Sequence, residues 1–347
     1  MKHTALYEEH EALGARMIPF GGYTLPGWYS HASAEHMAVR ESAGMFDIAH
    51  MGFVAIRGDA VHNAALLQKI VTNDIAKTQP NSIMYTFLLN ESGGILDDVM
   101  VGYNPLESAY YMIINAANKS KIMAWLEAHG LTRLDPQFDS HSLIAIQGPQ
   151  AIAAATPVIH TDWSALNRFT GQACRYANQE GFVMRSGYTG EDGIEVLFPN
   201  AVVPALWRDL QAQGIRPCGL LARDSLRIEA GLPLYGHELS ETINPRHTRY
   251  PWVLKWGTGF MGESALNNTP VTQHTVGLRF TDRCLPRQGD AIREGGVITS
   301  GTLSPVLQVP IAMAMVPLTI SIGQSVTVAI RGRHIPATVV KLPFILR

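Results

Sequence analysis

The spacing of apolar residues changes once along this chain, close to Leu266, and this change limits the folds open to it. Before that point, segments with the spacing of amphipathic helices alternate with short apolar strands. After it no helical period is present, and Gly, Pro and Asn separate five expected strands at 275–280, 297–300, 311–316, 325–330 and 335–340. The sequence therefore predicts α+β units followed by a small C-terminal β-barrel or sandwich.

The part before Leu266 contains material for two α+β units. A helix is expected over 60–71, and a strand at 110–114 is followed by a further helix. Beyond these, a buried strand at 142–147 precedes helices around Leu206 and over 220–230. A chain of 347 residues is too long for one hydrophobic core, so two or three domains are expected.

Composition excludes several classes of protein. The chain is 46% hydrophobic and 16% charged, which is typical of a globular protein, and no apolar run reaches the ~18–20 residues that span a membrane. Cys174, Cys218 and Cys284 are widely spaced and form neither a disulfide framework nor a zinc motif, as is usual in a reducing compartment. The first residues resemble no signal or transit segment. We therefore expect a cytoplasmic enzyme or binding protein.

Charge is distributed unevenly, although the net charge is only −2. Residues 271–347 contain eight Lys and Arg against three Asp and Glu, whereas the remaining residues contain 19 against 26. A basic C-terminal module on an acidic body favours an acidic partner or an anionic ligand tail. Nucleic acid is not expected as a partner, because the chain has no run of basic residues and no basic helix.

The run from Asn90 to Val101 places two carboxylates, Asp97 and Asp98, in an apolar strand after a Gly93-Gly94 turn. Because side chains alternate across a strand, Asp97 is expected on the face of Ile95, Val99 and Val101, and Asp98 on the other face. One carboxylate is then expected among apolar neighbours. The alternative is an edge hairpin in which both acids are solvated.

Two further segments have the composition of a binding site. Arg223 and Arg227 lie four residues apart on one helix face, where Arg223 can grip a carboxylate unless Asp224 simply neutralises the pair at the surface. The run Ser186 to Glu195 combines three glycines, Tyr188 and three acids. Glu195 can accept paired N–H donors from a flat heterocycle, or the run is a plain loop with solvated acids.

Other familiar motifs are absent or misplaced. Gly257 to Gly262 matches G-x-G-x-x-G, but no βαβ unit surrounds it, and Gly262-Glu263-Ser264 is better interpreted as a helix start. The histidines have no metal-ligand spacing, and no G-x-S-x-G elbow is present. The expected chemistry is therefore ligand positioning and carboxylate electrostatics, without a metal.

The motifs occur in an order that resembles the glycine cleavage system T-protein family of aminomethyltransferases. They extend over almost the whole chain: Leu6-Tyr7-Glu8-Glu9-His10, Phe20-Gly21-Gly22, Gly44-Met45-Phe46-Asp47, His50-Met51-Gly52, Thr72-Asn73-Asp74, Gly93 to Asp98, Tyr188 to Gly193, Cys218-Gly219-Leu220, Ala222-Arg223-Asp224, Leu234-Tyr235-Gly236, Thr299 to Thr302 and Lys341 to Phe344.

The resemblance implies an α+β, three-domain, ring-like folate-binding fold with two α+β units and a C-terminal small β-barrel. Residues 1–52 with 137–270 would form a discontinuous folate-binding domain, 53–136 the second α+β domain and 271–347 the barrel. The implied reaction transfers the one-carbon unit from the aminomethyl-lipoyl arm of the H-protein to tetrahydrofolate. The products are 5,10-methylene-tetrahydrofolate, ammonia and dihydrolipoyl H-protein, and no metal is required.

The resemblance also implies roles for individual residues. Asp97 matches the essential carboxylate of the family. The positions that hold the folate or line its cavity match Met51, Asn115, Tyr188, Glu195, Arg223 and Trp252.

The chain departs from the family pattern between Pro245 and Trp252, where it carries Arg246 to Pro251 in place of a Leu-Glu-Ala-Gly-Leu-Gly run. The change adds two positive charges beside the expected pocket. It keeps open a folate-dependent demethylase of a small methylated substrate. A non-catalytic folate-binding module is a further alternative, but Asp97 is present and the Lys-Gly-Cys-Tyr-x-Gly-Gln-Glu type motif of such modules is not.

Overall fold

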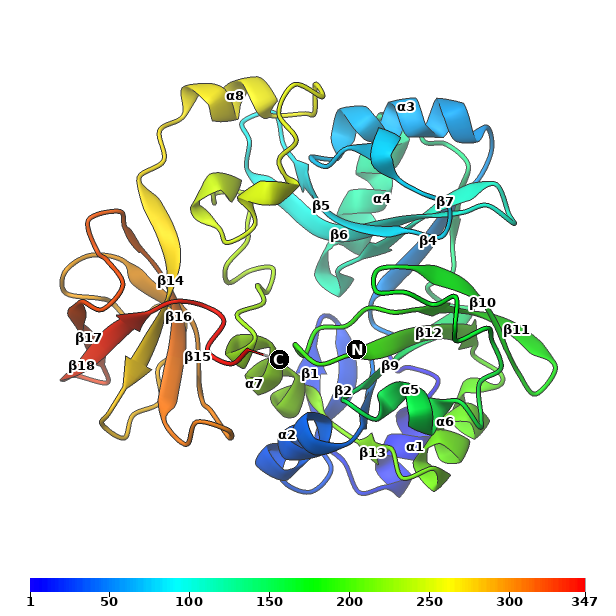
Figure 1. Ribbon diagram of the computed structural model, residues 1–347, viewed down its shortest axis with the longest axis horizontal. Helices are drawn as coiled ribbons and strands as arrows, with labels where there is room; N and C mark the ends of the chain where they lie inside the picture. The colour runs from blue at the N-terminus through cyan, green and yellow to red at the C-terminus, as the bar shows by residue number, and fades with distance from the viewer. Residues whose placement is uncertain (347) are drawn as a thin grey trace.

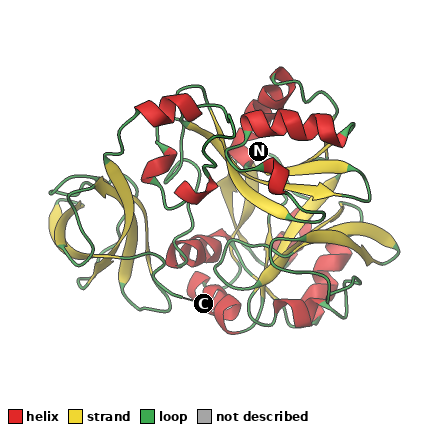
Figure 2. Cartoon of the chain, turned by 45° about the horizontal axis from the view of Figure 1, so that its top comes forward, coloured by secondary structure: helices red, strands yellow, loops and turns green. Residues whose placement is uncertain are grey.

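The computed structural model describes residues 1–346, which form three lobes (Figure 1). Two lobes combine strands with helices, whereas the C-terminal lobe consists of strands and loops (Figure 2). A helix close to the middle of the molecule, α7 (Leu220–Glu229), lies between the C-terminal lobe and the lobe that contains the N-terminal helices (Figure 1).

The first lobe is built on a six-stranded sheet with the order β10-β11-β12-β9-β3-β13. Its strands are β3 (Gly44–Asp47), β9 (His141–Gln147), β10 (Gly171–Tyr176), β11 (Gln179–Met184), β12 (Gly193–Pro199) and β13 (Arg216–Pro217). One face packs against α5 (Ala151–Ala155) and α6 (Val203–Ala212) through buried aliphatic side chains and Trp207. The lobe also holds α1 (Tyr7–Ala12), α2 (Ala32–Glu41) and the hairpin of β1 (Arg16–Phe20) and β2 (Tyr23–Trp28).

The second lobe is an antiparallel five-stranded sheet with the order β5-β6-β7-β4-β8. Its strands are β4 (Gly52–Ile56), β5 (Ile83–Leu89), β6 (Ile95–Asn104), β7 (Ala109–Ile114) and β8 (Leu134–Pro136). Leu67 and Ile70 of α3 (Ala60–Ile70) and Ile122 and Leu126 of α4 (Lys119–Ala128) cover one face. Between them run the short helices η1 (Ile75–Lys77) and η2 (Ala116–Asn118).

The two α+β lobes share a core. Phe46 and Leu143 of the first sheet pack in one buried cluster with Tyr111 and Ile113 of the second, and Ala222 and Leu226 of α7 join it. This shared core fixes α7 and the end of β7 relative to each other, which matters for the site described below.

The C-terminal lobe is an antiparallel sheet with the order β15-β16-β14-β18-β17, closed into a barrel. Residues 291–292 join its edges, because Ala291 bridges Val297 and Ile292 bridges Val328. The strands are β14 (Gln273–Phe280), β15 (Val297–Leu303), β16 (Pro310–Pro317), β17 (Ser325–Ile330) and β18 (Arg333–Val340), and all five were expected from the sequence.

The segment between α7 and β14 contains η3 (Pro245–His247), η4 (Pro251–Val253) and α8 (Glu263–Asn268). Leu239, Val253 and Phe260 of this segment pack on Phe87 and Ile95 of the second sheet. The helix start at Gly262 is as expected from the sequence. The domain boundaries given above stay a prediction.

Candidate functional site

The two carboxylates lie on β6, immediately after a tight turn that only glycine permits. Gly93 has a φ of +87°, and a Cβ on Gly94 would lie 1.8 Å from the carbonyl oxygen of Glu241. Asp97 pairs with Leu88 and Ile95 with Leu89, so Leu96 is an unpaired bulge residue. The bulge reverses the side on which residues before Asp97 point: Leu96 joins the core that holds Val99 and Val101, whereas Ile95 joins another core.

Both carboxylates meet at a single amide group. Nδ2 of Asn115 lies 2.8 Å from Oδ1 of Asp97 and 2.8 Å from Oδ1 of Asp98. The two acids still leave opposite faces of β6, because Asp97 bonds to Asn118 on the side of Val99, whereas Asp98 bonds to Tyr85 on the side of Met100. The expectation that Ile95 shares the face of Asp97 is wrong, because of the bulge. Pairing between β6 and β7 ends at Met100 and Ile113, and Asn115, directly after β7, enters the gap that follows.

Further donors surround each acid. The backbone N–H of Asn115 donates to Asp97 Oδ2 at 3.2 Å, and Asn118 Nδ2 donates to Asp97 Oδ1 at 2.7 Å. The hydroxyl of Tyr85, on β5, donates to Asp98 Oδ2 at 3.0 Å. Asp97 is fully buried.

Burial of two adjacent acids keeps a proton on the pair near neutral pH. Burial raises the pKa of both acids above the ordinary value, to about 7 and about 6, and the charge of one acid adds to the shift of the other, against the hydrogen-bond donors that oppose it. The acids interact so closely that they release their protons in two steps that belong to the pair.

Arg223 and Tyr188 form a second part of the site. The guanidinium carbon of Arg223 lies 4.9 Å from the ring centroid of Tyr188 and 5.8 Å from that of Phe46. Within residues 1–346, Nη1 of Arg223 is buried and has no hydrogen-bond partner. Burial lowers the pKa of Arg223, and the nearby Glu195 opposes this shift. The Tyr188 hydroxyl donates to the carbonyl oxygen of Pro233.

Glu195 and Met51 come from the first lobe and the strand that follows it. Glu195, on β12, is largely buried and accepts a hydrogen bond from Ser186 at 2.7 Å. The backbone N–H of Met51 donates to the carbonyl oxygen of Ile48 and closes a turn. The Met51 side chain packs against the shared core that contains Phe46. Glu195 follows Tyr188 on the next strand, and Met51 packs in the same shared core as α7, which carries Arg223.

Trp252 lies on η4 and is 52% exposed, unlike the other residues expected in the site. Its ring centroid is 6.4 Å from that of Tyr85 and 6.3 Å from that of Tyr250. Through Tyr85, this aromatic group reaches Asp98. The charge of Asp98 also contributes to the raised pKa of Tyr188, after burial and against the opposing charge of Arg227. The charge of Asp98 therefore acts on both the aromatic group and Tyr188.

The two arginines that depart from the family pattern are engaged at helix ends. Nη1 of Arg246 donates to the carbonyl oxygens of Leu266 and Thr269, at the end of α8. Nη1 of Arg249 donates to the carbonyl oxygen of Gly231 at 2.7 Å, just after α7. Cations at helix C-termini complement the helix dipole, so both side chains have a structural partner.

Sequence reasoning missed three polar residues here. Asn118 follows Asn115 by three residues, a spacing that one short helical turn brings to the same acid. Tyr85 gave no signal, because its contact depends on the pairing of β5 with β6. His50 is buried, its Nδ1 has no partner in the described part of the chain, and burial lowers its pKa to about 3, which keeps the ring neutral.

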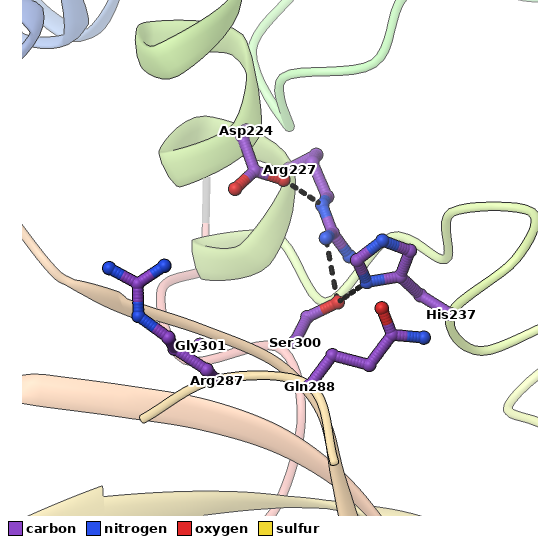
Figure 3. A pocket seen from close by; sticks show the side chains of 7 residues that line it. All are labelled: Asp224, Arg227, His237, Arg287, Gln288, Ser300 and Gly301. Carbon is purple, nitrogen blue, oxygen red and sulfur yellow. Dashed lines mark hydrogen bonds and ion pairs between the residues drawn. The ribbon is translucent and has the colours of Figure 1, made fainter. Parts of the chain in front are cut away.

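A cavity of about 330 Å³ lies one helical turn beyond Arg223, between α7 and the barrel (Figure 3). Asp224 and Arg227 of α7 face His237 and Ser300 across it. Arg227 donates to Asp224 at 2.9 Å and to Ser300 Oγ at 2.7 Å, and also to Glu238 at 3.0 Å. Through its bond to Ser300, Arg227 attaches α7 to the barrel. None of the predicted site residues lines this cavity.

Comparison with protein families decides the assignment. The GCVT N-terminal domain model matches residues 6–258, and the glycine cleavage T-protein C-terminal barrel domain model matches residues 273–345. The chain belongs to the glycine cleavage T-protein family. The expected family, the fold class and the aminomethyltransferase class of enzyme are thereby confirmed.

Relatives of the T-protein family match over nearly their whole length. An aminomethyltransferase of Synechococcus elongatus is 41% identical over 95% of this chain and 92% of its own. An aminomethyltransferase of Bordetella avium is 40% identical over 99% of this chain and 96% of its own length. The crystal structure of glycine cleavage system aminomethyltransferase T from Bartonella henselae superimposes with a TM-score of 0.92 at 32% identity, covering 99% of this chain and 98% of that one.

Two other features bear on the class of protein. Within residues 1–346, no group of three or more His, Cys, Asp and Glu side chains is arranged to hold a metal ion. In the same residues, no helix has the length and apolar character needed to cross a membrane.

Proposed function

We propose that this chain transfers the one-carbon unit of an aminomethyl group, carried on the lipoyl arm of the H-protein, to tetrahydrofolate. The products are 5,10-methylene-tetrahydrofolate, ammonia and the dihydrolipoyl H-protein. Membership in the T-protein family supports this proposal. The structural observation that supports the proposal most directly is the buried carboxylate of Asp97, which accepts hydrogen bonds from two N–H groups of Asn115 and one of Asn118.

Asp97 is the proposed catalytic residue. As ammonia leaves, positive charge develops on the one-carbon unit, and a carboxylate fixed in a buried site stabilises that charge without reorganising. The amide donors hold the carboxylate in one orientation. They also favour its ionised form, which the reaction requires.

The remaining predicted residues are proposed to hold tetrahydrofolate. Glu195 is suited to accept N–H groups from the pterin, and Arg223 has a buried donor, Nη1, that no residue of the described chain engages. Tyr188, Met51 and Trp252 offer aromatic and apolar surface, and Asn115 links this surface to Asp97. No metal takes part in this proposal.

The H-protein is the proposed partner, and the basic C-terminal barrel is the proposed contributor of charge to its docking. Residues 1–52 with 137–270, 53–136 and 271–347 are the proposed domains. The cytoplasm is the proposed location, which rests on the widely spaced, unpaired cysteines.

Product identification tests the function. Aminomethylated H-protein, tetrahydrofolate and the enzyme should give 5,10-methylene-tetrahydrofolate and ammonia in equal amounts. Formation of 5-methyl-tetrahydrofolate only from a small methylated amine, sulfonium or ether would favour the demethylase instead. Tetrahydrofolate binding with neither reaction would leave a binding module and overturn the proposal.

A further inference from the structure

Asp97 and Asp98 compete for one amide group. Nδ2 of Asn115 has three acceptors within 3.0 Å: Oδ1 of Asp97, Oδ1 of Asp98 and the carbonyl oxygen of Asp98. It has only two hydrogens. Asn115 therefore cannot fully satisfy both carboxylates, and the other partners of each acid decide how the pair shares its charge.

The other partners of Asp97 are N–H donors. They are the backbone N–H of Asn115 and the side-chain amide of Asn118, the latter at 2.7 Å. Asn118 is itself buried, and its side-chain amide donates to Asp97. With Asn118 in this orientation, all three groups that bond to Asp97 are N–H donors, and three donors favour a carboxylate over a protonated carboxyl there.

Asp98 differs because its other partner is a hydroxyl. Tyr85 lies 3.0 Å from Oδ2 of Asp98, and a phenol can donate to a carboxylate or accept from a protonated carboxyl. A proton on Asp98 Oδ2 therefore has an acceptor in place. The two acids, adjacent in the sequence, have opposite abilities to hold a proton.

Other titratable groups face the pair without competing for the proton. Tyr235 donates to the carbonyl oxygen of Ile95, and Lys121 of α4 bonds to the Tyr235 hydroxyl and pairs with Glu241 at 2.7 Å. Tyr188 and Tyr250 lie toward Asp98, and burial raises the pKa of each phenol, so both remain neutral near pH 7.

We propose that the pair divides its roles: a single retained proton resides on Asp98 against Tyr85, and Asn118 is the positioning residue that keeps Asp97 a carboxylate. This inference rests on the proposed function, in which Asp97 is the reacting group. It explains why two adjacent buried acids serve a reaction that needs one negative charge. Neutral Asp98 removes the repulsion that would otherwise push a proton onto Asp97.

A titration of the folate-free protein tests this division without any turnover. Protein labelled with ¹³C at the aspartate side-chain carboxyls is titrated by NMR, and the two signals are assigned by their loss in Asp97→Asn and Asp98→Asn. Between the two protonation steps, the Asp98 signal should have the shift of a protonated carboxyl and the Asp97 signal that of a carboxylate. The reverse assignment at that pH would overturn the proposal.

Asn118→Ala should then raise the pH at which Asp97 ionises by about one unit, because a donor to the charged form is lost. Asn63→Ala is the matched control: it removes a buried amide of α3 that donates to the Arg57 carbonyl oxygen in the same lobe. The control should leave both aspartate titrations unchanged. An unchanged Asp97 titration in a folded Asn118→Ala protein would remove Asn118 from the account.

Asp98→Asn provides a second test if Asn118→Ala fails to fold. An amide has the shape of the protonated acid, so this variant should keep folate-dependent ammonia release within about tenfold of the parent, whereas Asp97→Asn should lose about a hundredfold or more. Equal losses in the two variants would contradict the division of roles. Absence of ammonia release in the parent, with the NMR assignment as expected, would instead overturn the proposed function.

Discussion

The guanidinium of Arg223 stacks on the ring of Tyr188, with 4.9 Å between its central carbon and the ring centroid. The shared core of the two α+β lobes fixes α7, which carries Arg223, and Tyr188 follows β11 in the first sheet. A planar cation held between two rings, with one buried donor unpaired, is prepared to bind a polar ligand edge.

Arg223→Lys should weaken tetrahydrofolate binding by about tenfold, because lysine keeps the charge but loses the planar stack and the fork of donors. Calorimetric titration with tetrahydrofolate measures the change. Arg216→Lys is the matched control, since Arg216 is exposed on β13 and bonds to Ser30 at the surface. Equal affinity in the parent and Arg223→Lys would remove Arg223 from the folate site.

Asp97→Asn should stabilise the folate-free protein at pH 8. Burial raises the pKa of both acids of the Asp97–Asp98 pair in the folded state, so the folded state binds more protons than the unfolded chain, and stability falls as pH rises from about 4 through 7. The amide avoids this loss, and the expected gain is about 2 kcal/mol at pH 8 and close to zero at pH 4. Urea unfolding at the two pH values measures it; a gain that is equal at both would contradict the raised pKa.

Acid should destabilise the protein through another buried acid. Burial disfavours the charge of Asp47, but hydrogen bonds from His10 and Thr4 outweigh burial and hold its pKa below the ordinary value. Its contribution is therefore complete above pH ~4 and is lost as pH falls through the lowered pKa. Asp47→Asn should flatten the decline of stability below pH 4 seen in urea unfolding of the parent. A decline that stays as steep would show that other acids cause it.

Docking of the H-protein should weaken with salt. The barrel segment 271–347 carries a net charge of +5, and exposed charges are screened over about 8–10 Å at physiological ionic strength. The double variant Arg331→Glu with Arg333→Glu, on the exposed β17–β18 turn, should raise the KM for H-protein, and Arg175→Glu on the exposed face of β10 serves as the control. A KM independent of salt would argue against electrostatic docking.

The sequence predicted the fold well where local patterns decide it. The five barrel strands and α3, α6 and α7 follow from apolar spacing and from glycines at their ends. The family resemblance brought Asp97, Asn115, Arg223, Tyr188 and Glu195 into consideration, and each has buried or partly buried polar contacts. The roles of these residues stay predictions until variants are measured.

The rest depended on contacts that a pattern along the chain does not contain. The bulge at Leu96 takes Ile95 off the face of Asp97, and the end of β6–β7 pairing lets one amide, that of Asn115, reach both acids from the gap. Tyr85 joins the site only through strand pairing. Arg246 and Arg249 looked like additional charge for the pocket, but they donate hydrogen bonds to carbonyl groups at the C-terminal ends of α8 and α7, where distant segments meet.

Ammonia release from aminomethylated H-protein, measured with and without tetrahydrofolate in the parent and in Asp97→Asn, tests the central claim most directly. Asp135→Asn is the control, because Asp135 is a partly exposed acid of the same lobe that pairs with Arg57. We predict folate-dependent release in the parent and in Asp135→Asn, a loss of about a hundredfold or more in Asp97→Asn, and similar tetrahydrofolate affinity in all three. Near-normal release by a folded Asp97→Asn protein would contradict the account.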